Sequence, residues 1–150
     1  MSNPQPTHHD AELVLKLYEL RREPVMREAR SYIAGIAPNS ADDLLAITMA
    51  FGTKENAYLR QVFGYWEMVA SLIVHGTLNP VLAYDTCQEM FFVYSIVAPY
   101  LAEVREKGGM PEFFKNVQKV VDGSPEGKER IDRIQKRRAM MMGRRVAAAN

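Results

Sequence analysis

The stretch Arg60–His75, RQVFGYWEMVASLIVH, decides the fold of this chain. When each residue advances by about 100°, as in an α-helix, the large apolar side chains around this stretch fall on one face. The members of that face are Leu59, Val62, Phe63, Trp66, Val69, Ala70 and Ile73. Gly76 follows directly and is a typical C-terminal stop. We therefore predict a central, buried helix from about Lys54 to His75.

Outward from this helix, apolar residues at helical spacing alternate with short turn signals. The expected helical segments are 10–36 with a kink at Pro24, 41–51, 54–75, 80–107 with an interruption at Pro99, 110–121 and 125–142. No useful β alternation appears between them. The pattern predicts an all-α fold, a compact bundle of five to six helices in a single domain. That domain spans residues 10–142, between a flexible N-terminal arm over 1–9 and a frayed C-terminal tail over 143–150.

The composition is that of a globular protein. Apolar residues make up 47% and charged residues 25% of the 150 residues, which argues against disorder of the whole chain. The N-terminus lacks the pattern of a secretory signal, and no apolar stretch reaches the roughly 20 residues of a membrane span. The single cysteine, Cys87, favours a reducing compartment. We therefore expect a cytoplasmic location and no membrane partner.

Charged residues on and near the central helix, together with its tryptophan, form the first candidate site. Its members are Arg21, Arg22, Arg60, Trp66, Glu67, Asp85 and Glu89. One interpretation is a pocket whose carboxylates perform acid–base chemistry or hold a metal ion. The other, which we favour, is an ion-pair network that ties helices together, with an arginine bound to Glu67. No known catalytic motif, metal-ligand motif or cofactor motif occurs, so we assign no catalytic residue, metal ligand or cofactor.

The C-terminal segment is the only region with a biased charge. Residues 126–150 hold eight Lys or Arg and three Asp or Glu, a net charge of +5. The candidate basic surface consists of Arg130, Arg133, Lys136, Arg137 and Arg138. Such a surface can contact phosphate backbones, although no aromatic residue is interleaved for base stacking. The apolar run Met140–Met142 instead favours a contact with another protein or a second subunit.

Three segments carry a resemblance to a known group of proteins. They are LYELRREPVMREAR (17–30), YWEMVASLIVHG (65–76) and EMFFVYSIVAPYLAEVRE (89–106). Their order resembles that of small all-helical bacterial proteins in a domain-of-unknown-function family, over about Ala11 to Val121. The resemblance implies kinship but no established activity, and it carries no catalytic residue to this chain.

These observations favour a non-enzymatic interaction or scaffold module that self-associates, as a dimer, or binds another protein. Two alternatives stay open. The first is a small-ligand-binding or enzymatic domain with a pocket near Trp66, Glu67, Asp85 and Glu89. The second is a weak nucleic-acid binder that uses the basic C-terminal helix.

Overall fold

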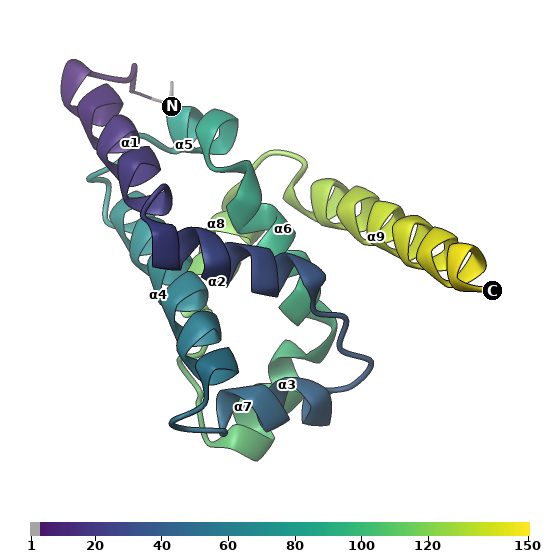
Figure 1. Cartoon of the computed structure of the whole chain (residues 1–150). Helices are drawn as coiled ribbons and strands as arrows, with labels where there is room; N and C mark the ends of the chain where they lie inside the picture. The colour runs from purple at the N-terminus through teal and green to yellow at the C-terminus, as the bar shows by residue number, and fades with distance from the viewer. Residues whose placement is uncertain (1–3) are drawn as a thin grey trace.

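The computed structural model describes residues 4–150, and over that range the chain is helical with no strand. The helices are α1 (His8–Arg21), α2 (Pro24–Gly35), α3 (Ala41–Thr48), α4 (Lys54–Val74), α5 (Pro80–Thr86), α6 (Gln88–Val97), α7 (Leu101–Gly108), α8 (Lys115–Gly123) and α9 (Gly127–Ala149), with a 3-10 turn, η1 (Ala98–Tyr100), between α6 and α7. The all-α prediction is confirmed (Figure 1).

The expected number of helices, five to six, is too low because two expected segments are divided, 10–36 at one place and 80–107 at two. Pro24 lies at the first position of α2, where proline lacks only an N–H that a helix start leaves unpaired anyway. Cys87 breaks the next long segment, since its φ of −105° and ψ of 47° are not helical. Pro99 lies inside η1 and separates α6 from α7.

Side-chain caps define most helix starts. Ser40 and Asn79 cap α3 and α5, as their sequence positions indicate. At α1 the cap is Thr7, and Asp10 completes a capping box from the third helical position. This capping box explains why α1 begins at His8, inside the segment 1–9 that was expected to be an arm; residues 1–3 lie outside the described range.

Two later boundaries also differ from the sequence prediction. The helix expected over 110–121 begins only at Lys115, because Phe114 takes a left-handed conformation with φ 56°. The last helix continues through Gly143 to Ala149, beyond the predicted end at residue 142. Good helix formers such as Met, Arg and Ala fill most of that extension.

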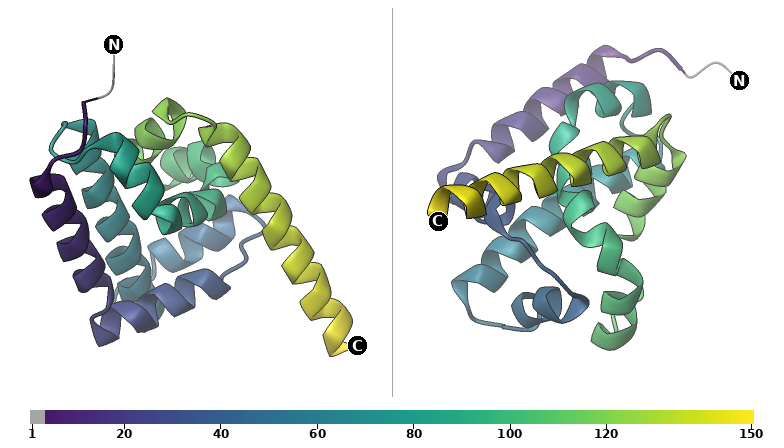
Figure 2. Two further views of the ribbon diagram at one scale, coloured as in Figure 1. Left: turned by 90° about the horizontal axis from the view of Figure 1, so that it is seen from above. Right: turned by 90° about the vertical axis from the view of Figure 1, so that its right-hand side faces the viewer.

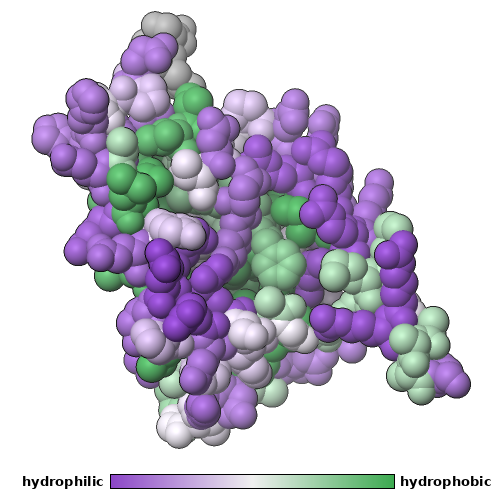
Figure 3. Space-filling view, turned by 45° about the horizontal axis from the view of Figure 1, so that its top comes forward, coloured by the Kyte–Doolittle hydropathy of each residue, from purple (hydrophilic) through white to green (hydrophobic). Residues whose placement is uncertain are grey.

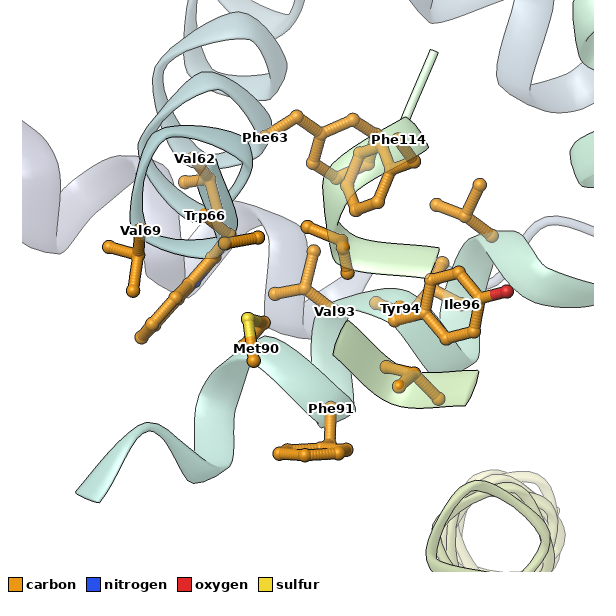
Figure 4. Close-up of a cluster of buried hydrophobic side chains, with 14 of the residues drawn as sticks. Val62, Phe63, Trp66, Val69, Met90, Phe91, Val93, Tyr94, Ile96 and Phe114 are labelled. Atoms are coloured by element: carbon orange, nitrogen blue, oxygen red, sulfur yellow. The ribbon is translucent and has the colours of Figure 1, made fainter. Parts of the chain in front are cut away.

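Helix α4 forms the centre of the core, as predicted. All seven members of the predicted apolar face are buried, and Trp66 is only 1% exposed. Helices α2 and α8 pack against α4. Figure 4 shows Trp66 beside Met90 of α6, and Phe63 beside Phe114 from the turn before α8. The core therefore joins segments that lie far apart in the sequence.

Helix α9 is the exception to this compact arrangement. It packs mainly on α6 through its N-terminal half. Its C-terminal half extends beyond the other helices in Figure 1 and in the left view of Figure 2. Every residue from Ala139 to Asn150 is exposed. Among the described helices, including α9, none is both long and apolar enough to cross a membrane.

Candidate functional site

The structure divides the first predicted group of residues between two places. Glu89 binds Arg30, whose Nε donates hydrogen bonds at 2.9 Å to both carboxylate oxygens, and Arg21, whose Nη1 lies 3.5 Å from Oε2. The Arg21 guanidinium also lies 5.4 Å from the centre of the Trp66 ring. Arg21, Trp66 and Glu89 are therefore neighbours, and Arg30 is a further partner that the predicted group did not include.

Glu67 lies elsewhere, and the prediction that an arginine binds it is wrong. Its carboxylate accepts hydrogen bonds from the backbone N–H groups of Asn116 at 2.8 Å and Val117 at 3.1 Å. These N–H groups belong to the first turn of α8, which has no side-chain cap of its own because Phe114 occupies the N-cap position. Glu67 thus caps a helix that is distant in sequence, and a carboxylate also suits the positive end of that helix.

Arg60, Arg22 and Asp85, the other members of the group, form no ion pair with Glu67 or with Glu89. Arg60 lines a hollow with Glu67, whereas Glu89 lines a different hollow beside Arg30. Arg22 is exposed and lies 5.9 Å from the Tyr18 ring centre. Asp85 is exposed, and no ion pair among residues 4–150 involves it. The residues near Trp66 therefore do not form one continuous site.

A different site emerges where α9 faces α2 and α6. Three adjoining hollows of about 400, 650 and 240 Å³ share Phe92 of α6 as a common lining residue. Arginines from α2 and α9 surround this floor. They are Arg27, Arg30, Arg130, Arg133, Arg137, Arg138 and Arg145. We call these joined hollows the arginine groove. Figure 3 shows hydrophobic residues between the hydrophilic residues of the body and those of the projecting α9, at the right.

Specific contacts hold α9 in place along the groove. The Arg130 guanidinium lies 4.3 Å from the Phe91 ring centre and donates to the Tyr84 carbonyl at 3.3 Å. One turn later, Gln135 donates to the Ser95 carbonyl. Arg138 donates to the Ile36 carbonyl at 3.3 Å and lies 5.7 Å from the Phe92 ring centre. Two of the predicted basic residues therefore orient α9 in addition to providing charge.

The groove carries a large positive charge with little compensation. Glu89 is the only acidic residue among those that line the three hollows, and it is bound to Arg30 and Arg21. Arg133, which also lines the groove, lies near Glu126 and Glu129, at 3.8 and 3.9 Å. Within the described chain, Arg27, Arg137 and Arg138 have no carboxylate within ion-pair distance.

Arg138 makes this imbalance most evident. Burial lowers the pKa of its guanidinium, because removal from water disfavours the charged form. A partly buried charge is normally paired with an opposite charge. Arg138 is therefore a partly buried guanidinium whose partners in the described chain are the Ile36 carbonyl and the Phe92 ring, not a carboxylate.

The polar lining of the groove consists mainly of guanidinium groups. Guanidinium groups stay protonated at neutral pH and present several N–H donors in a planar fork that matches carboxylate and phosphate oxygens. Arg27 and Phe92 were not in the predicted basic surface, because nothing in their spacing shows that α2 and α6 face α9.

The described residues contain no cluster of three or more His, Cys, Asp or Glu that could hold a metal ion. Burial raises the pKa of the Cys87 thiol, as expected for a core cysteine.

The fold and the groove together define an all-helical protein with an arginine-lined groove beside its C-terminal helix. The chain belongs to the family described as domain of unknown function DUF4760, whose model matches residues 6–124. The comparisons with curated proteins and with solved structures gave no match. Helices α2 and α6 lie within the matched range, whereas α9 follows it, so the family domain and the helix after it build the groove jointly.

Proposed function

We propose that this protein is a non-enzymatic interaction module that self-associates, with the arginine groove of one copy receiving an acidic surface of another. The arginine groove is the observation that carries the proposal. It combines an apolar floor with guanidinium groups on α2 and α9, and arginine is enriched at protein interfaces for its planar, multidentate binding.

The charge distribution of the chain favours a second copy as the partner. Residues 126–150 have a net charge of +5, and the whole chain has +1, so residues 1–125 have −4. One copy therefore offers a basic helix and an acidic body. Opposite charges of this kind steer association and set the orientation of the two partners.

An apolar patch that overlaps the end of the groove supports the same role. Met140, Met141 and Met142 are 61%, 53% and 40% exposed, and Val146 is 62% exposed. Methionine side chains adapt to irregular partner surfaces. The distal half of α9 also lacks the packing that normally stabilises helices in proteins, and a partner would supply it.

Sedimentation velocity at low and high salt tests this proposal. We expect the wild-type protein to form dimers at low salt and to dissociate as salt screens the exposed charges. The double variant Arg27→Glu/Arg137→Glu should stay monomeric at low salt, because it places carboxylates in the groove. The control Lys16→Glu/Lys119→Glu makes the same change in net charge at exposed residues that lie outside the groove and outside α9.

Two outcomes would contradict self-association through the groove. One is a wild-type monomer at low salt. The other is equal dimerisation of the groove variant and its control. A buried, free Cys87 further supports the cytoplasmic location that we infer for this module.

Nucleic-acid binding is the second candidate function, and it uses the same groove. Phe92 adds an aromatic surface that the C-terminal segment lacks, next to arginines that can contact phosphates. The negative body opposes this function, because it repels a long phosphate backbone. Fluorescence anisotropy with labelled single-stranded DNA separates the two candidate functions. If the protein binds nucleic acid, its affinity for this DNA falls steeply as salt is added, and Arg137→Glu abolishes the binding.

A further inference from the structure

A second hollow lies where the turn before α4, α4 itself and the turn before α8 meet. Its volume is about 400 Å³, within the range of small-molecule sites. We call it the aromatic pocket, because Phe51, Phe63, Phe113 and Phe114 line it. It shares no lining residue with the arginine groove, so its function is independent of the proposed self-association.

The aromatic side chains are held in a defined arrangement. Phe63 meets Phe114 edge to face at a centroid distance of 4.7 Å, and Phe113 meets Phe114 at 5.0 Å. The left-handed backbone at Phe114, with φ 56°, is unfavourable for a bulky residue, and such conformations concentrate at ligand sites. Phe51 remains 72% exposed at this hollow, so a large aromatic ring is available to a ligand.

Gly64 is a second, independent indication that the aromatic pocket is a ligand site. It lies inside the 21-residue helix α4, where glycine is less favourable than alanine. A Cβ atom at this position would meet nothing within 4 Å, so packing within the described chain does not require glycine. Gly64 lines the aromatic pocket, and its missing side chain leaves room for a ligand to approach the helix closely.

The charges around the pocket define the ligand further. Glu67 is bound to the first turn of α8, and Glu112 forms an ion pair with Lys115 at 2.6 Å. Arg60 also lines the pocket, and no ion pair of residues 4–150 involves it. Of the three charged residues that line the pocket, Arg60 is therefore the one without a polar partner in the described chain, and it lies next to apolar walls.

From these observations we infer that the aromatic pocket binds a small apolar carboxylate, with the hydrocarbon body against the phenylalanines and Gly64 and the carboxylate on Arg60. The apolar body gains by leaving water, and the guanidinium forks onto the two carboxylate oxygens. The inference assigns a ligand class to a pocket that shares Arg60 and Glu67 with the residues predicted from the sequence.

Isothermal titration calorimetry of the full chain with decanoate, and with 1-decanol as the uncharged probe, tests the inference. We expect decanoate to bind, and Arg60→Gln to weaken it about tenfold while leaving the binding of decanol unchanged. Gly64→Leu should abolish binding of both probes because its side chain fills the pocket, while the melting temperature stays the same or rises. Gly143→Leu is the matched control, since Gly143 also lies inside a helix with nothing within 4 Å of an added Cβ.

The results separate a ligand site from an accidental hollow. Loss of decanoate binding in Gly64→Leu, with retained folding and normal binding by Gly143→Leu, supports the inference. Absence of decanoate binding by the wild-type protein overturns it. Equal decanoate affinity in wild type and Arg60→Gln overturns the role of the carboxylate, and unchanged binding by Gly64→Leu overturns the location.

Discussion

At the residue scale, Glu67 shows which features of a side chain the sequence predicts and which it does not. Its position at the edge of the apolar face of α4 predicts that it is partly buried and needs a partner. The sequence suggests an arginine, because arginines are plentiful in the first helices. The actual partners are the N–H groups of Asn116 and Val117. Backbone donors at a distant helix start leave no sequence signal, so this partner was not predictable.

Replacement of Glu67 measures how much this cap contributes to the free energy of unfolding. Glu67→Gln keeps the shape but removes the charge and one acceptor, so we expect a loss of about 1–2 kcal/mol in the free energy of unfolding. This is smaller than the loss expected for a broken buried ion pair, about 3–5 kcal/mol. Urea unfolding measures it, with the exposed Glu112→Gln as control. Equal stability of the two variants would refute the capping role.

Asp10 provides a pH-dependent prediction at the same scale. Hydrogen bonds from the Thr7 side chain and backbone, and then from the Asn79 N–H, lower the pKa of its carboxyl below the ordinary 3.8. A lowered folded-state pKa stabilises the fold at pH values above the unfolded-state value, and this contribution disappears as the pH falls through the folded-state value.

We therefore expect acidification below about pH 4 to reduce the urea midpoint of the wild-type protein more steeply than that of Asp10→Asn, which cannot titrate. Glu12→Gln, an exposed change on the same helix, should follow the wild-type curve. Parallel curves for wild type and Asp10→Asn would show that Asp10 does not stabilise the fold in this way.

At the element scale, the sequence predicted the central helix far better than the turns around it. The apolar face of α4 repeats at helical spacing and is large enough to specify burial without other information. The turn before α8 has no such signal: Met110-Pro111 reads as a helix start, yet Phe113 and Phe114 pack on Phe63 and delay the helix to Lys115. Tertiary packing overrides the local preference there.

The junction between α8 and α9 yields an element-scale prediction. A Cβ atom at Gly127 would lie 2.0 Å from the Val121 carbonyl oxygen, a backbone atom that cannot move independently. Gly127→Ala should therefore displace the start of α9 and cost about 1–3 kcal/mol, comparable to overpacking a core. Gly143→Ala on the same helix should be neutral or stabilising.

Thermal unfolding followed by circular dichroism provides the measurement for both glycine variants. A Gly127→Ala protein as stable as Gly143→Ala would mean that the junction tolerates a side chain. It would then not fix the direction of α9, which forms one side of the arginine groove.

At the scale of the whole molecule, the groove depends on how α9 lies against α2 and α6, and the sequence does not show this. The basic character of residues 126–150 was evident, but not that α9 lies opposite the arginines of α2 over Phe92. The apolar run Met140–Met142 favoured a contact surface from the sequence alone, and the structure places these side chains in the solvent. The structure adds the adjoining charged groove, which makes the expected association dependent on salt.

Native mass spectrometry of the full chain, sprayed from a gentle low-salt buffer beside the Arg27→Glu/Arg137→Glu variant, measures whether the groove joins two copies. We expect a dimer for the wild-type protein and a monomer for the groove variant. A bare wild-type monomer, indistinguishable from the variant, would contradict this expectation.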